Sequence, residues 1–169
     1  WANKLEPSRL SQTLPPYVTV HTGNNHAGAG FFEPNSAPLP VGDAVMGLQN
    51  SKRRREVTEA DFNRQIALRS KLDQDFTDRF SKGQRSVRAY DEMFNSAVKL
   101  MSSKDLEAFD LSKESKGTHA AYGSDKFSKG VLLSRRLVEH GVRFVEVQLG
   151  GFDWHSDNFT KAEEKLPIL

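Results

Sequence analysis

The sequence predicts an α/β fold with a mostly helical middle segment, and three observations carry this prediction. A helical stretch at 125–140 is followed directly by the apolar run 142–149, which is the order of a helix leading into a strand. A second strand is indicated at 17–20. Between them, residues 57–116 show the apolar spacing of amphipathic helices. We therefore expect helices and strands to pack as layers around one core.

The charge and the Cys content restrict the function classes. Among 169 residues, Lys and Arg number 24 and Asp and Glu number 22, which gives a net charge of +2. A dedicated nucleic-acid binder carries a larger basic excess, so we expect no nucleic-acid partner. No apolar run approaches the roughly 20 residues that cross a bilayer, so we expect no transmembrane segment. The absence of Cys leaves His, Asp and Glu as candidate metal ligands.

The two ends of the sequence suggest that residues 1–169 are an internal fragment of one larger α/β domain. The first Met is Met46, so we do not expect Trp1 to be a translation start. The final residues, 165–169, are mostly apolar, which is unusual for a solvated tail. A partial sheet exposes strand edges and apolar faces. We therefore expect folding to need the rest of the same chain or an assembly.

Residues 1–50 are expected to be a loop-rich segment with one short strand at 17–20. This segment holds six of the 7 Pro and five of the 12 Gly residues. A polar, glycine-bearing loop follows the strand and contains His21 and His26. These two side chains could bind an anion or a metal, although loop histidines are more often solvated.

Residues 57–116 are expected to form a helical segment. Thr58 and Asp61 resemble a capping box at the start of the first helix. The apolar stripe of that helix has four-residue spacing and consists of Leu68, Leu72, Phe76 and Phe80. The second helix carries its apolar residues at Val87, Tyr90, Phe94, Val98 and Met101. Ser103 is expected to cap a short third helix, and 112–117 to be a polar connector.

Residues 125–169 are expected to form a helix-strand-loop-helix unit that carries the candidate site. The helix at 125–140 places Phe127, Val131 and Val138 near one face, with Leu133 and Leu137 beside it. Gly141 follows in the position of a left-handed C-cap. The strand that comes next is expected to be largely buried, because its apolar residues occupy both faces.

Asp153 and His155 are the candidate metal ligands. They follow the strand and Gly150-Gly151, and ligands in open α/β sheets bind at this carboxyl end. Residues two positions apart in an extended segment point to the same side. A carboxylate and an imidazole suit zinc, manganese or iron. A loop Asp that caps a backbone amide explains the same triplet. Asp157 or Asn158 is expected to cap the next helix, and the alternatives are a third ligand or a group that hydrogen-bonds to the ligands.

The stretches 128–147 and 150–159 resemble a bacterial family, the domain-of-unknown-function 1501 family, which is grouped with the alkaline phosphatase and sulfatase superfamily. The family pattern is a helix ending in Leu-Leu-x-Arg-Arg-Leu-Val, a glycine, a strand, and then Gly-Gly-Trp-Asp-Thr-His. Here Phe152 and Trp154 replace the family's Trp and Thr, while Asp153 and His155 are kept. Residues 14–18 and 28–32 also resemble the family.

The resemblance implies that the chain is part of a three-layer alkaline phosphatase-like sandwich. It further implies a metal-dependent hydrolase of phosphate or sulfate esters, either small molecules or polysaccharides. Asp153 and His155 would then bind a divalent metal, such as zinc, manganese or calcium. The Ser or Thr nucleophile would lie outside residues 1–169, and the catalytic residues are therefore unknown. Family members often carry a twin-arginine export signal, which implies an extracytoplasmic location.

The alternative interpretation is a non-catalytic exported protein that keeps the fold and binds a partner or has a structural role. In that case the helical middle, with the basic run Lys52–Arg55, would form a surface for a partner or an acidic polysaccharide. A solvated surface is the simplest explanation of such a run. This alternative predicts no metal at Asp153 and His155.

Overall fold

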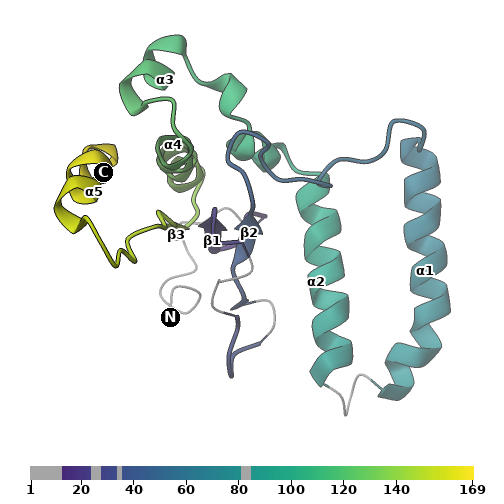
Figure 1. Cartoon of the computed structure of the whole chain (residues 1–169). Coiled ribbons are helices and arrows are strands. Elements are labelled where there is room, and N and C mark those ends of the chain that lie inside the picture. The colour runs from purple at the N-terminus through teal and green to yellow at the C-terminus, as the bar shows by residue number, and fades with distance from the viewer. Residues whose placement is uncertain (1–12, 24–27, 34–35, 81–84) are drawn as a thin grey trace.

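The computed structural model describes residues 13–23, 28–33, 36–80 and 85–169, and it combines short strands with helices (Figure 1). The strands are β1 (Tyr17–Val20), β2 (Leu39–Val41) and β3 (Phe144–Val147). The α-helices are α1 (Glu59–Phe80), α2 (Arg85–Met101), α3 (Lys116–Tyr122), α4 (Lys126–Glu139) and α5 (Asn158–Lys165). The 3-10 helices are η3 (Lys104–Phe109), η4 (Leu111–Lys113) and η5 (Leu166–Ile168). The predicted α/β class is confirmed.

The three strands form one parallel sheet in the order β2-β1-β3. Val18 of the central strand pairs with Leu39 on one side and with Val145 on the other. Strands β2 and β3 lie on opposite sides of β1, and the connection between them contains helices α1 to α4. All three strands therefore end at the same edge of the sheet, where the segments after Val20, Val41 and Val147 begin.

Strand β2 was not predicted from the sequence, whereas β1 has the predicted bounds. β2 has only three residues, and Pro40 in its centre cannot donate a backbone hydrogen bond. An edge strand tolerates Pro because only one of its sides is paired. Such a short, Pro-containing segment carries no alternation that a sequence pattern can detect.

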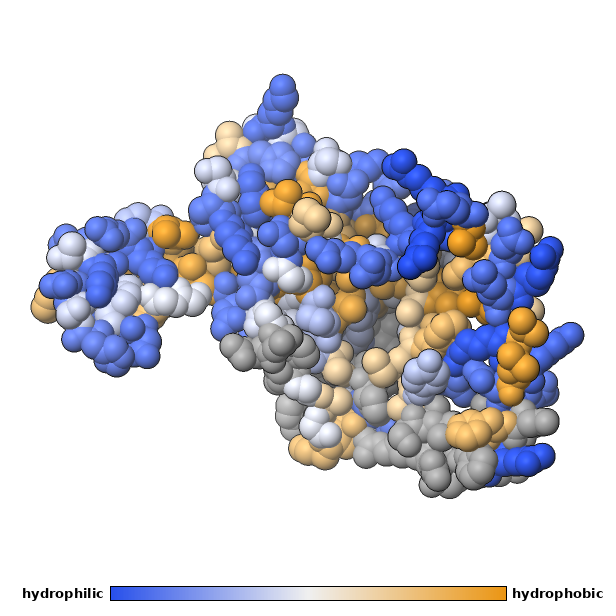
Figure 2. Space-filling view, turned by 45° about the vertical axis from the view of Figure 1, so that its right-hand side comes forward, coloured by the Kyte–Doolittle hydropathy of each residue, from blue (hydrophilic) through white to orange (hydrophobic). Residues whose placement is uncertain are grey.

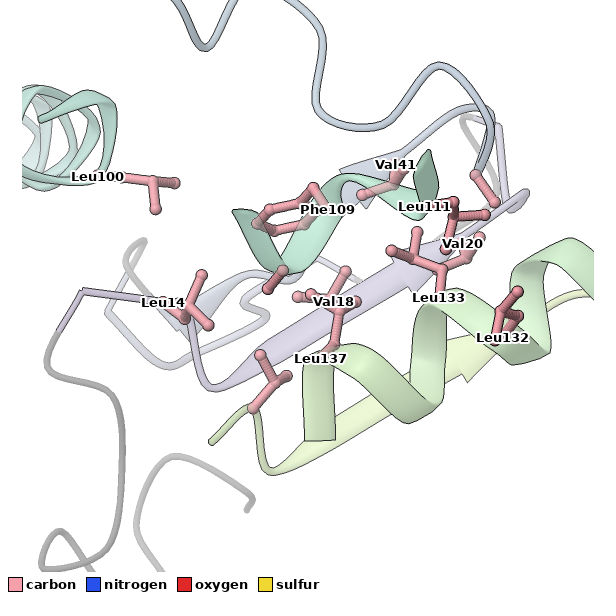
Figure 3. Close-up of a cluster of buried hydrophobic side chains, with 13 residues drawn as sticks. Leu14, Val18, Val20, Val41, Leu100, Phe109, Leu111, Leu132, Leu133 and Leu137 are labelled. Carbon is pink, nitrogen blue, oxygen red and sulfur yellow. The ribbon is translucent and has the colours of Figure 1, made fainter. Parts of the chain in front are cut away.

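The core lies between the sheet and one side of α4 (Figure 3). Val18 and Val20 of β1 are fully buried, as are Leu133 and Leu137 of α4. Phe109, at the end of η3, belongs to the same cluster. Burying one such side chain contributes about 1.5–3 kcal/mol. This contact between segments more than 100 residues apart stabilises the sheet.

The three apolar residues of α4 that share one face by helical spacing are not the buried ones. Val138 is exposed, and Phe127 and Val131 are only half-buried. Leu133 and Leu137 face the core instead. Both sets satisfy helical spacing, so periodicity alone does not distinguish them.

Gly130 explains which set is buried. A Cβ at Gly130 would lie 2.7 Å from Cγ1 of Val147 and 3.1 Å from the ring of His21. The missing side chain lets the helix backbone approach the ends of two strands closely. Leu133 and Leu137 follow Gly130 at three and seven positions, so they are turned to the same side and onto the sheet.

The sequence predicted that strand β3 is largely buried, and this prediction was wrong. The strand is only half-buried. Among the described residues, it lies at the edge of the sheet and pairs with a strand on one side only. Val145 and Val147 pack partly against the core, while Phe144 is exposed. Continuous apolar runs are typical of strands covered on both faces, but the same run occurs here in an edge strand.

Helix α1 begins where the sequence predicted. The Thr58 hydroxyl accepts a hydrogen bond from the Asp61 N–H at 3.1 Å and donates to the Asp61 carboxylate at 2.7 Å. Ser103 caps η3 by accepting from the Asp105 N–H. Within the part of the chain that the structure describes, no helix is both long and apolar enough to cross a membrane.

The predicted polar connector at 112–117 contains helix ends, so this prediction was wrong. Asp110 caps η4, which extends to Lys113, and Ser115 caps α3 by accepting from the Thr118 N–H at 3.0 Å. Ser and Asp are the residues that helix N-termini prefer. The segment contains no apolar residue, and this hid the helix ends from a search based on periodicity.

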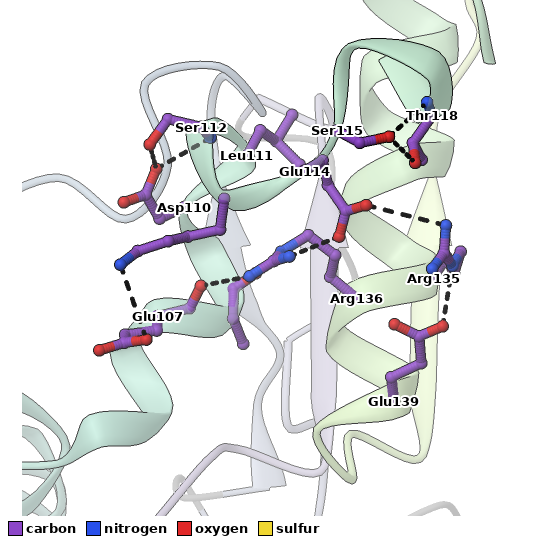
Figure 4. Close-up of polar contacts among 12 residues, drawn as sticks. Glu107, Asp110, Leu111, Ser112, Glu114, Ser115, Thr118, Arg135, Arg136 and Glu139 are labelled. Carbon is purple, nitrogen blue, oxygen red and sulfur yellow. Dashed lines mark hydrogen bonds and ion pairs between the residues drawn. The ribbon is translucent and has the colours of Figure 1, made fainter. Parts of the chain in front are cut away.

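Arg136 connects α4 to η3 and to the segment before α3 through hydrogen bonds (Figure 4). Its buried guanidinium donates to the carbonyls of Glu107 at 2.8 Å and Ala108 at 3.2 Å. It also donates to the Glu114 carboxylate at 2.5 Å. This hydrogen bond, together with the charge of Arg136, holds the pKa of Glu114 below its usual value.

Candidate functional site

The candidate site is the loop between β3 and α5, at the carboxyl edge of the sheet. Asp153 and His155 project to the same side of this loop, with Oδ1 of Asp153 and Nε2 of His155 separated by 3.6 Å. Their side chains are 92% and 90% exposed. The two candidate ligands are therefore adjacent and open to solvent.

The separation of these two atoms fits one metal ion. Two ligands at the usual Zn–N and Zn–O distances, at a tetrahedral angle, are about 3.3–3.4 Å apart. The observed 3.6 Å is close to this value. Within residues 13–23, 28–33, 36–80 and 85–169, no group of three or more His, Asp or Glu side chains is placed to hold a metal ion. A metal ion at this pair would therefore need ligands beyond these two side chains.

Two lysines of α5 hold the loop in shape. The Lys165 ammonium donates to the carbonyls of Gly150 and Gly151 and lies 5.0 Å from the centre of the Phe152 ring. Lys161 donates to the Ser156 carbonyl at 2.9 Å. These contacts connect α5 to both ends of the segment that contains Asp153 and His155.

Sequence reasoning did not assign a role to Lys161 and Lys165. One signal for them was present, because lysines four positions apart on a helix lie on one face. The turn at Gly151, with φ 82°, brings the two glycine carbonyls within reach of one ammonium. Sequence alone does not show that these carbonyls converge.

Asp157 occupies the N-cap position of α5, as predicted for it or Asn158. Its φ of 55° is left-handed, and its side chain makes no capping hydrogen bond. The position was therefore correct but the capping interaction is absent. The alternative role of Asp157, as a third metal ligand, stays a prediction.

His21 and Asp43 follow the other two strands at the same edge. Nε2 of His21 accepts a hydrogen bond from the Ala44 N–H at 3.2 Å. Nδ1 of His21 is buried and has no hydrogen-bond partner among the described residues. Asp43 accepts from the N–H groups of Val45 at 2.8 Å and Met46 at 3.2 Å, and these bonds hold its pKa below the usual value.

These contacts give His21 a structural role. Burial of the ring, and secondarily the charge of Lys126, lowers the pKa of His21, although Asp43 opposes this. One ring nitrogen is used by Ala44 and the other is enclosed, so neither faces solvent as a ligand would. His26, the second loop histidine, lies outside the described residues.

Comparison with known proteins identifies the family. The sequence profile described as "Protein of unknown function (DUF1501)" matches residues 1–169. The chain belongs to the DUF1501 family. No curated protein and no solved structure matches this chain. The predicted domain-of-unknown-function membership is thereby confirmed over the whole sequence.

Proposed function

We propose that this DUF1501 chain contributes Asp153 and His155 to the divalent-metal centre of an ester hydrolase of the alkaline phosphatase and sulfatase type. The observation that supports the proposal is the 3.6 Å separation of Oδ1 and Nε2 on a solvent-open loop at the carboxyl end of a parallel strand. In this proposal the three parallel strands are part of a larger three-layer sandwich.

The donor pair indicates which metal suits the site. An imidazole nitrogen together with a carboxylate favours zinc or manganese, whereas calcium prefers oxygen ligands alone. A bound ion of this kind would activate the nucleophile and neutralise charge on a phosphate or sulfate ester. Asp153 and His155 would hold the ion, and Lys165 would keep their loop in place. In this proposal the nucleophile and the remaining metal ligands lie outside residues 1–169.

The substrate class and the cellular location are inferred from the resemblance to hydrolases of the alkaline phosphatase and sulfatase type. The loop is open to solvent, which suits either a small ester or the ester group of a polysaccharide. We propose an extracytoplasmic location for the intact protein, as in family members that carry an export signal.

Metal content tests the proposal. The intact protein, purified without chelator and resupplied with zinc or manganese, is measured by plasma mass spectrometry and titration calorimetry. We expect near-stoichiometric metal that is lost in the Asp153→Ala plus His155→Ala double variant. Glu164→Gln is the matched control, because it removes an exposed carboxylate from the neighbouring helix α5 and leaves the candidate ligands in place. No bound metal in the wild type would refute the ligand assignment.

The lysine contacts give a smaller test of the same site. Lys165→Ala frees the Gly150 and Gly151 carbonyls, so we expect a several-fold loss of metal affinity with the ligands intact. Lys165→Arg, which retains the charge and the donors, is expected to recover most of this loss. Hydrogen exchange of the amides at 150–156 measures loop order without metal. Unchanged metal affinity in Lys165→Ala would show that the loop is held by other contacts.

The second candidate function is a non-catalytic exported protein that binds an acidic polysaccharide or has a structural role. The observation that favours it is the basic run Lys52–Arg55, whose four side chains are all exposed before α1. A salt-sensitive affinity for heparin that is lost on replacing these four residues with Ala would support this function. Absence of metal at Asp153 and His155 in the same protein would decide in its favour.

A further inference from the structure

The helices α1 and α2 form a hairpin, and an arginine lies at the contact between them. The guanidinium of Arg69 lies 3.6 Å from the centre of the Phe94 ring, between the two helices. Arg69 also pairs with Asp73 at 3.1 Å and with Asp91 at 3.1 Å. The charged side chain of Arg69 therefore lies between the two helices where they contact each other.

Apolar side chains of the hairpin lie beside this contact. Five of them are between 52% and 70% exposed, namely Leu68, Leu72, Phe76, Tyr90 and Met93. Figure 2, in which the hairpin side is turned forward, shows apolar side chains among charged ones on this part of the surface. The hairpin thus presents these five apolar side chains to solvent.

These residues share one face of the hairpin. At about 100° per residue, Leu72 is rotated about 60° from Arg69, and Met93 is rotated about 100° in the same sense from Phe94. The two helices run antiparallel, so rotation in the same sense brings both stripes to one side. We call this surface the hairpin face.

Helix α1 is long, with 22 residues, but buries none of its described side chains. Helices in proteins derive most of their stability from packing an apolar face. With five large side chains at least half exposed, the hairpin face presents roughly 600 Å² of apolar surface, which is at the upper end for a monomer.

We propose that the hairpin face pairs with the hairpin face of a second copy of this chain. Two such faces would bury roughly 1,200 Å² in total, which reaches the lower limit of a specific, stable interface. A two-fold axis would form a four-helix bundle in which neighbouring helices are antiparallel, and the same residues would serve both copies. This inference is independent of the metal site.

The oligomeric state of the intact protein tests the pairing. Sedimentation equilibrium is expected to show a dimer, and Leu72→Glu is expected to raise its dissociation constant at least about 100-fold, because each copy buries a charge. Val45→Glu is the matched control, since Val45 is 67% exposed and Leu72 is 70% exposed, but Val45 lies outside the hairpin. Circular dichroism verifies that the variants are folded.

A complementation experiment identifies the second copy as the occupant. Leu72→Glu protein mixed with Leu72→Lys protein is expected to form a heterodimer more readily than either variant pairs with itself, because the interface then carries opposite charges in place of like charges. A wild-type protein that stays monomeric to about 100 μM would overturn the proposal, and protection of α1 amides in that monomer would show that its own chain covers the face. A dimer unaffected by Leu72→Glu would equally overturn it.

Discussion

Helices α4 and α1 carry apolar residues at similar spacing, yet only α4 is buried. In α4, Leu133 and Leu137 pack against the central strand and are fully buried. In α1, Leu68 and Leu72 are exposed although their spacing is just as regular. The spacing predicts that both segments are helices with one apolar face. It does not predict what covers that face.

Two arginines show the same contrast. Arg136 is buried and donates to two carbonyls and the Glu114 carboxylate, which are contributed by separate segments. Arg69 is more exposed and pairs with Asp73 and Asp91 on the hairpin itself. A buried ion pair requires every partner, because an uncompensated charge in the interior is costly. The core is therefore expected to be more sensitive to substitution than the hairpin.

Arg136→Ala is expected to have the largest effect. It leaves Glu114 and two carbonyls without their donor, and breaking a buried pair in this way costs about 3–5 kcal/mol. Arg69→Ala removes a partly exposed pair, so we expect a loss of about 1 kcal/mol or less. Urea denaturation of the intact protein measures both. Equal losses would show that the hairpin is as tightly coupled as the core.

Leu133→Ala is expected to cause the second largest loss of stability. Removing a fully buried Leu side chain costs about 2–5 kcal/mol, because a cavity remains between α4 and the sheet. Leu72→Ala is the matched substitution in the hairpin, and at concentrations below dimer formation we expect a change within about 0.5 kcal/mol. A large effect of Leu72→Ala in the monomer would mean that the same chain covers the hairpin face.

Two glycines in helices provide the next comparison. Gly130→Ala places a methyl group 2.7 Å from Cγ1 of Val147, and overpacking of this kind costs about 1–3 kcal/mol. In Gly117→Ala the nearest atom is Oγ of Ser115 at 3.7 Å, so we expect a gain of up to about 1 kcal/mol from helix propensity. Thermal unfolding of both variants measures the difference. A stabilising Gly130→Ala would disprove the close approach of α4 to the sheet.

The smallest expected effect is a pH dependence confined to the core. The pKa of His21 is lowered in the folded state, so the unfolded chain binds the proton first as the pH falls. Stability is therefore complete above the unfolded pKa of about 6.5 and decreases below it. His21→Asn, which tolerates the positive φ of 63°, is expected to flatten this dependence between pH 7 and 5.5. Identical slopes in the two proteins would contradict the assignment.

Part of the candidate site was predictable from the sequence. The spacing of Asp153 and His155 indicated that both side chains leave one side of the loop, and they do, with their donor atoms 3.6 Å apart. The lysine contacts to the Gly150 and Gly151 carbonyls were not predictable, because they depend on a turn that brings α5 back over the loop. The enclosure of His21 was hidden as well, since Gly130 lies 109 positions further along the chain.

The sequence by itself determined the elements whose hydrogen bonds close within a few residues. Thr58 and Ser103 begin helices where predicted, and Gly141, with φ 93°, follows the end of α4. Only the tertiary structure decided which helix faces are buried, because burial depends on contacts between distant segments such as Val18 and Leu133. It also decided that a three-residue strand containing Pro40 joins the sheet, since pairing with β1 supplies hydrogen bonds that no local pattern encodes.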